Sequence, residues 1–137
     1  MHTGLIAHIK KYINLTDGEI IILNQYTRQL EIKKKANLLK EGQVCRTNYF
    51  VVKGCLRLFF IDEKGVEQTT QFAIENWWIT DYHSFCNQLP SQFYIQAVEN
   101  ATVISFGKAL QEELFVKIPQ LERYFRRILE ISYGASQ

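Results

Sequence analysis

Short strand-forming segments separated by turn residues fill the middle of this chain, between helical segments at its two ends. From Thr27 onward apolar residues tend to alternate with polar ones, which places the apolar side chains on one face of a strand. Turn residues interrupt the alternation at Lys40-Glu41-Gly42 and at the stretch DEKG, residues 62–65. Many short strands with such turns are typical of a β-barrel or jelly roll. The sequence therefore predicts a β-barrel over residues 26–106.

Two junctions between neighbouring strands have the composition of β-hairpins. Lys53-Gly54 separates the segments 49–52 and 56–61, and the turn at 62–65 leads into the segment 67–72. A tight hairpin needs a residue that accepts positive φ, and glycine does so without steric cost. Both junctions are predicted to join strands that pair with each other. Two further strands, at 93–98 and 102–106, are predicted to follow.

Helical patterns flank the barrel on both sides. Apolar residues recur at helical spacing near the N-terminus, and Thr16 with Glu19 has the pattern of a capping box. Pro119 lies where proline suits the first turn of a long final helix. The sequence therefore predicts N-terminal helices within residues 1–25 and C-terminal helices within residues 107–137.

Composition indicates a single domain without disulfide or membrane support. A chain of 137 residues with 47% hydrophobic and 22% charged residues is ordinary for one globular domain. Its apolar runs are shorter than the roughly 18 residues of a membrane helix, and residues 1–15 lack a signal-peptide pattern. The cysteines Cys45, Cys55 and Cys86 are too widely spaced for a disulfide framework. We expect a cytoplasmic chain with reduced thiols and no membrane contact.

Charge and side-chain chemistry argue against nucleic-acid contact, metal binding and catalysis by these residues. The net charge of +2 is too small to indicate a nucleic-acid surface. An enzyme of the cupin type needs clustered metal ligands, and His2, His8 and His83 are scattered along the chain. Nucleophile motifs and phosphate loops are missing. We expect no enzymatic activity, no metal and no cofactor; stoichiometric metal in the purified protein would favour the cupin alternative.

A more specific signal lies in the stretch LLKEGQ (residues 38–43) followed by YFVVKGCLRL (residues 49–58). This run resembles the sensor domain of Crp/Fnr superfamily transcription regulators, and the turn at 62–65 is similar to the next turn of that family. The resemblance extends over about residues 15–133. It implies a mainly β fold with flanking helices, a double-stranded β-helix or jelly-roll barrel like cyclic-nucleotide-binding domains. Another antiparallel barrel with similar turns is the alternative.

The resemblance also implies the position of a ligand cassette. Nucleotide-binding members hold the cyclic phosphate with a Gly-Glu-Leu-type segment at a helix N-terminus and a later Arg-Ser/Thr-Ala. Thr80 takes the glycine position here, Asp81 the glutamate, Tyr82 the leucine, Ser91 the arginine and Gln92 the serine or threonine. The key cation is therefore missing, which costs on the order of 1.5–3 kcal/mol of binding. We expect no tight cyclic-nucleotide binding.

A barrel that has lost its nucleotide can still keep a pocket. We expect an unidentified aromatic or mildly polar effector, or an aromatic cluster that simply fills the space. Asp81 also suits the N-cap of a short helix near residues 82–87. The alternative is a true cyclic AMP or cyclic GMP sensor with a substitute cation, Arg123 or Arg127. The candidate ligand-binding residues are Thr80, Asp81, Tyr82, His83, Ser91, Gln92 and Phe93, with Trp77 and Tyr94 beside them.

The final helix carries two apolar stripes, one able to pack on the barrel and the other on a second subunit. The resemblance implies homodimerisation through this helix, whereas one broad face buried in a monomer is the alternative. In the family the helix leads into a helix-turn-helix domain, so we expect such a domain beyond residue 137 and DNA binding only by the intact protein. The expected function is effector sensing and dimerisation in a bacterial regulator. The candidate interface residues are Leu121, Tyr124, Phe125, Ile128 and Ile131, with Leu129 and Ser132 in the second stripe.

Overall fold

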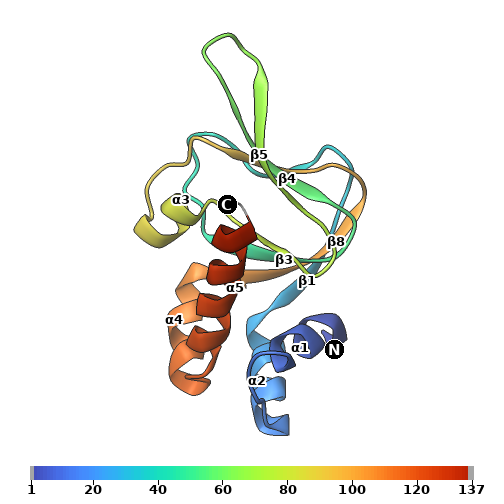
Figure 1. Ribbon diagram of the computed structural model, residues 1–137, viewed down its shortest axis with the longest axis vertical. Helices are drawn as coiled ribbons and strands as arrows, with labels where there is room; N and C mark the ends of the chain where they lie inside the picture. The colour runs from blue at the N-terminus through green and yellow to red at the C-terminus, as the bar shows by residue number, and fades with distance from the viewer. Residues whose placement is uncertain (1, 136–137) are drawn as a thin grey trace.

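The computed structural model describes residues 2–135 and has a β-barrel flanked by helices at both ends of the chain (Figure 1). Helices α1 (Thr3–Lys10) and α2 (Asp17–Tyr26) precede the barrel, and α4 (Lys108–Lys117) and α5 (Leu121–Ala135) follow it. The strands and the short helix between them are β1 (Arg28–Ile32), β2 (Asn37–Leu39), β3 (Thr47–Lys53), β4 (Leu56–Ile61), β5 (Glu67–Ala73), β6 (Trp78–Ile79), α3 (Tyr82–Asn87), β7 (Tyr94–Ala97) and β8 (Ala101–Gly107). This order confirms the predicted fold class.

Two antiparallel four-stranded sheets form the barrel, in the orders β1-β8-β3-β6 and β2-β7-β4-β5. Alternation along β3 explains how the first sheet serves two cores. Tyr49 and Val51 point into the barrel, where they pack with Leu56 and Ile95 of the opposite sheet. Phe50, between them, belongs to a second cluster formed with the helices. The first sheet therefore has apolar side chains on both faces, as a sheet covered by helices requires.

The turn at Gly54 does not join a hairpin, so that prediction is wrong. β3 pairs with β6 and β8, whereas β4 pairs with β5 and β7, so the turn carries the chain from one sheet to the other. Gly54 has φ of +96°, and a Cβ there would lie 2.6 Å from the carbonyl oxygen of Asn100. Glycine is required because the turn at Gly54 touches the turn that contains Asn100. The Lys53-Gly54 composition, which is also typical of a hairpin, here joins strands of different sheets.

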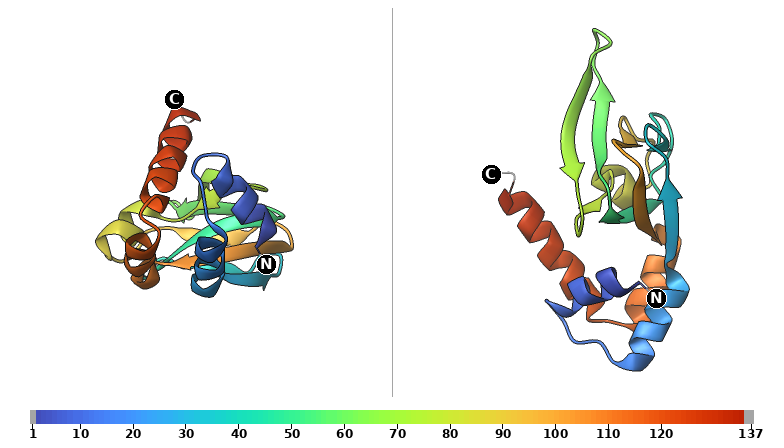
Figure 2. Two further views of the ribbon diagram at one scale, coloured as in Figure 1. Left: turned by 90° about the horizontal axis from the view of Figure 1, so that it is seen from below. Right: turned by 90° about the vertical axis from the view of Figure 1, so that its right-hand side faces the viewer.

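The hairpin between β4 and β5 is confirmed and extends away from the helices (Figure 2). Asp62 holds its turn, because one carboxylate oxygen accepts hydrogen bonds from the backbone N–H groups of Lys64 and Val66 at 2.9 and 3.0 Å. Gly65 completes the turn with φ of +80°. These bonds to the ionised form keep the pKa of Asp62 below its usual value.

The helices pack on the outer face of the first sheet, on the side of the molecule opposite the β4–β5 hairpin (Figure 2). Thr16 and Glu19 form the predicted capping box at the start of α2. Leu121 and Tyr124 of α5 are fully buried in this core. Neither side chain is available to a second subunit, so their assignment to a dimer interface is corrected. Within residues 2–135, no helix has the length and apolar character needed to cross a membrane.

A hydrogen-bonded chain through Tyr124 joins three elements at this core. The indole N–H of Trp78 donates to the Tyr124 hydroxyl at 2.8 Å, and the same hydroxyl lies 2.8 Å from Nδ1 of His8. The hydroxyl accepts from Trp78, and the tautomer of His8 decides whether it donates to Nδ1 or accepts a second hydrogen bond from it. Burial lowers the pKa of His8, and the nearby charge of Lys11 lowers it further. Burial raises the pKa of the Tyr124 hydroxyl well above its usual value.

Candidate functional site

The candidate cassette lies at the start of α3, where Asp81 forms the N-cap. Its Oδ1 accepts a hydrogen bond from the backbone N–H of Ser84 at 3.5 Å. Its Oδ2 accepts the hydroxyl hydrogen of Ser91 at 2.5 Å. Asp81 and Ser91 are only 6% and 4% exposed, so the pair is closed off from solvent. The prediction of Asp81 as a helix cap is confirmed, and the structure adds Ser91 as its partner.

Thr80 and Ser91 are both engaged by their own chain. The Thr80 hydroxyl donates to the carbonyl oxygen of Thr47 at 2.9 Å and lies 3.1 Å from the sulfur of Cys45. It therefore ties the residue after β6 to the start of β3. Ser91 also accepts the backbone N–H of Phe93 at 2.9 Å. Gln92, which lies between Ser91 and Phe93, is exposed.

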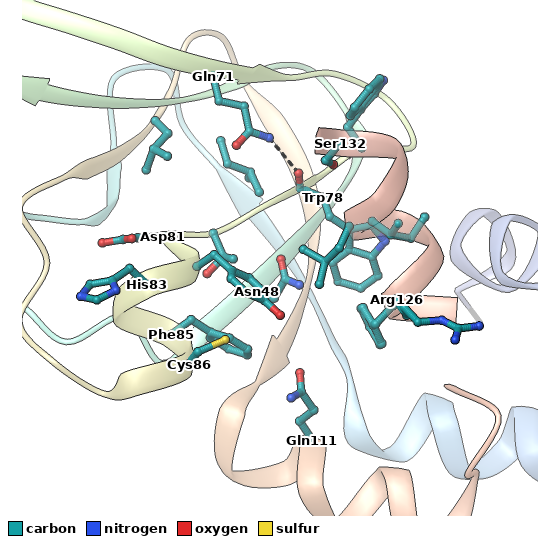
Figure 3. Close-up of a pocket in the computed structure, with 18 of the residues that line it drawn as sticks. Asn48, Gln71, Trp78, Asp81, His83, Phe85, Cys86, Gln111, Arg126 and Ser132 are labelled. Carbon is teal, nitrogen blue, oxygen red and sulfur yellow. Dashed lines mark hydrogen bonds between the residues drawn. The ribbon is translucent and has the colours of Figure 1, made fainter. Parts of the chain in front are cut away.

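A cavity of about 720 Å³ lies beside this pair and extends to the C-terminal helices (Figure 3). Five of the seven candidate ligand-binding residues line the cavity, whereas Ser91 and Gln92 do not. Tyr94 also lies outside the lining, stacked on Phe59 with ring centroids 4.9 Å apart. The candidates that line the cavity are Thr80, Asp81, Tyr82, His83 and Phe93, and Trp77 joins them.

The opposite wall of the cavity comes from α4 and α5, from which only Arg123 and Arg127 were predicted as possible ligand contacts. Phe125 and Ile128 line it, although both were predicted as dimer contacts. The signal that could have found this wall is the second apolar stripe of the final helix, because one stripe was expected to pack on the barrel. Asn48 on β3 and Gln71 on β5 add polar groups that the alternating pattern did not single out.

The charges around the cavity do not favour an anion. Asp81 and Glu122 contribute two carboxylates to the lining, and Arg126 contributes the single guanidinium among the described lining residues. Arg123 and Arg127, the two proposed substitute cations, do not line the cavity, and Arg127 pairs with Glu130 at 3.3 Å. His83 lines it from α3 but is exposed, with its Nδ1 3.3 Å from the Asn87 amide nitrogen.

Arg57, a cation of the barrel itself, is engaged away from the cavity. Its guanidinium donates to the side chain of Gln96 at 2.7 Å and to Glu67 at 2.8 Å. It also lies over the Phe59 ring, 3.9 Å from the centroid. These partners fix it on β4 and leave it outside the lining of the cavity.

The described part of the chain contains no group of three or more His, Cys, Asp or Glu residues that could hold a metal ion. Its cysteines are all free, with Cys45 buried, Cys55 half-buried and Cys86 exposed at the cavity. The site therefore consists of the buried Asp81–Ser91 pair, an adjoining mainly apolar cavity and a wall formed by α5.

Comparison with known proteins places this arrangement in a family. A family model for the cyclic nucleotide-binding domain matches residues 29–117. The chain is 28% identical over 116 residues to the fumarate and nitrate reduction regulatory protein of Vibrio cholerae, covering 84% of this chain and 46% of that protein. It thus spans about half the length of the curated relatives it matches.

Solved structures share the fold at low sequence identity. A cyclic nucleotide-binding domain from Methylobacillus flagellatus matches with a TM-score of 0.79 at 14% identity, over 95% of this chain and 76% of that one. The catabolite activator protein of Thermus thermophilus matches with a TM-score of 0.74 at 16% identity, over 90% of this chain and 57% of that one. These findings confirm the resemblance inferred from the turns of the barrel. The chain belongs to the cyclic nucleotide-binding domain family.

Proposed function

We propose that this chain is the effector-sensing and dimerisation domain of a cytoplasmic Crp/Fnr-type transcription regulator, and that its cyclic-nucleotide cassette no longer binds nucleotide. The observation that carries this proposal is the buried pair of Asp81 and Ser91. Ser91 stands at the position that matches the family's arginine. Its hydroxyl donates a hydrogen bond to the Asp81 carboxylate. The residue at the position expected to neutralise a phosphate therefore binds a carboxylate of its own chain.

Electrostatics support the same conclusion. A helix N-terminus attracts an anion because its backbone N–H groups are unpaired and its dipole is positive there. In this chain the Asp81 carboxylate already caps α3. A cyclic phosphate entering the cassette would meet this negative charge, and Arg57 is not available to offset it because its guanidinium is held by Glu67 and Gln96. The alternative function is a nucleotide sensor with Arg123 or Arg127 as the cation. Its support is weak because neither arginine lines the cavity beside the cassette.

Calorimetric titration with cyclic AMP and cyclic GMP tests the proposal. We expect no saturable heat with either nucleotide at concentrations up to about 1 mM, which corresponds to a binding free energy weaker than about −4 kcal/mol. Saturable binding in the micromolar range would overturn the proposal. Repeating the titration with Arg123→Ala and Arg127→Ala would then show whether either arginine supplies the missing charge.

Dimerisation is proposed to use the part of α5 that its own subunit leaves accessible. Leu121 and Tyr124 are buried, and Phe125 and Ile128 pack against the helical core while remaining half-buried. Ile131 is half-buried outside that core, so it is the predicted interface residue most available to a partner helix. A dimer seam of apolar residues at spacings of three and four is typical of paired helices.

Ile131→Glu tests the dimer, since a charge in an apolar seam is costly to bury. We expect the wild-type chain to sediment as a dimer and Ile131→Glu to shift it to a monomer. Arg123→Glu, an exposed position on the same helix, is the control and should leave the dimer intact. A wild-type monomer at about 100 μM would contradict this proposal. DNA binding is proposed for the intact regulator, through a helix-turn-helix domain outside residues 1–137.

A further inference from the structure

The cavity beside the closed cassette contains a buried polar group that its own chain does not satisfy. Asn48 is 8% exposed, and its Oδ1 accepts no hydrogen bond from the part of the chain that the structure describes. Asn48 is also a lining residue of the cavity. Figure 3 shows it between the α3 side chains, including Phe85, and the Trp78 ring. Nearly all buried acceptors in folded proteins have a donor, so this one indicates a missing partner.

Asn48 faces the helices and not the barrel interior. It lies two positions before Phe50 on β3, and residues at that spacing share a face of a strand. Phe50 packs into the helical core, together with Trp78. The amide of Asn48 is therefore directed toward the space between the first sheet, α3 and α4, where Gln111 lines the same cavity. Asp81 lines the same cavity, but its Oδ2 is already bound by the hydroxyl of Ser91.

The walls around Asn48 select the class of molecule that would fit. Most of the lining is apolar or aromatic, including Trp78, Phe85, Phe115 and Phe125. A volume of about 720 Å³ lies within the range of natural small-molecule sites. Carboxylates outnumber the single guanidinium in the described lining, which disfavours an anion. An unpaired carbonyl oxygen needs an N–H or O–H donor.

We propose that this cavity binds a neutral, largely aromatic molecule that donates one hydrogen bond to Oδ1 of Asn48. The inference rests on the proposed effector-sensing function and names the chemical class of the effector. The bound molecule contacts the barrel on one side and Phe125, Leu129 and Ser132 of α5 on the other. Binding therefore stabilises α5 in its position against the barrel, because the ligand binds most tightly to the arrangement in which it contacts both the barrel and α5.

Indole and benzofuran test the proposal as a matched pair of probes. The two molecules have nearly the same shape, but only indole carries an N–H donor. Calorimetric titration of the wild-type chain should show indole binding at least tenfold more tightly than benzofuran. Asn48→Leu should abolish that preference, because the acceptor is gone while the apolar walls remain. Gln111→Leu, which removes a different lining amide, should keep the preference at least tenfold.

Melting temperatures separate a binding effect from misfolding. Asn48→Leu should melt no lower than the wild type, because it replaces an unpaired buried amide with an apolar side chain. Equal affinity of the wild type for the two probes, or binding of neither, overturns the proposal. So does a tenfold indole preference that survives in a folded Asn48→Leu. None of these results affects the closed cassette, which fails only if cyclic AMP or cyclic GMP binds.

Discussion

Removing the Tyr124 hydroxyl should destabilise the domain more than its small volume suggests. Tyr124 lies on α5, and its fully buried ring contacts residues of α1 and β6. Tyr124→Phe keeps this ring and deletes the oxygen that bonds Trp78 and His8. Trp78 is 6% exposed, so its indole N–H would stay buried without an acceptor. A buried donor left unpaired costs about 1–3 kcal/mol, whereas a lost bond to a group that can reach water costs about 0.5–1.5 kcal/mol.

These two contributions sum to a loss of about 1.5–4.5 kcal/mol, counting His8 as half-buried. For a domain of this size, that loss corresponds to a fall in melting temperature of roughly 5–16 °C. Urea unfolding at pH 7.5, followed by tryptophan fluorescence, measures the change, and Trp78 itself reports on the site. The fluorescence amplitude of the folded variant also shows whether the indole environment changes.

Tyr12→Phe provides the matched control. The Tyr12 ring lies in the same cluster, 5.8 Å from the Tyr124 ring, but its hydroxyl makes no hydrogen bond within the described residues 2–135. Its loss should change the free energy of unfolding by less than about 0.5 kcal/mol. A Tyr124→Phe variant within about 0.5 kcal/mol of the wild type, or a control as destabilised as the variant, would refute the role of the hydroxyl.

Three other measurements follow from the structure. The folded-state pKa of His8 lies below its unfolded value of 6.5, so the unfolded state binds the proton more readily and stability should fall as pH drops below about 6.5. Urea unfolding at pH 7.5 and 5.5 should show a smaller loss of stability for His8→Gln than for the wild type. Gly54→Ala should cost about 3 kcal/mol or more because a methyl group would meet backbone atoms at 2.6 Å, whereas Gly65→Ala, at positive φ with open space, should cost about 1 kcal/mol by thermal melting. Asp81→Ala should cost about 1–2 kcal/mol through the lost cap, and a double-mutant cycle with Ser91→Ala should give a coupling above about 0.5 kcal/mol; additivity would contradict the pair.

Features that depend only on residues close together in the sequence could be predicted from the sequence. The capping box at Thr16 depends on two side chains three positions apart, and it formed as predicted. The Gly54 turn was misassigned because its composition specifies positive φ but not which strands pair beyond it. Pairing is decided by the apolar faces of both sheets, which residues far apart in the sequence build together.

The site shows the same division between local and long-range information. Asp81 was identified by its place at the start of α3, but its bond to Ser91 joins positions ten residues apart. Leu121 and Tyr124 have helical periodicity, which predicts an apolar face and not what covers that face. Asn48 interrupts an apolar strand with a polar residue, yet its burial and its place in the cavity depend on segments far away in the sequence.

The central claim is that the chain's own carboxylate and hydroxyl occupy the cassette that would otherwise hold a cyclic phosphate. Amide chemical shifts in a two-dimensional NMR titration with cyclic AMP test it residue by residue. The backbone N–H of Ser84, which is bonded to Asp81, and that of Ser91 should stay unshifted at about 1 mM nucleotide. Saturable shifts at both amides would contradict the claim, because they would show the nucleotide displacing the internal pair.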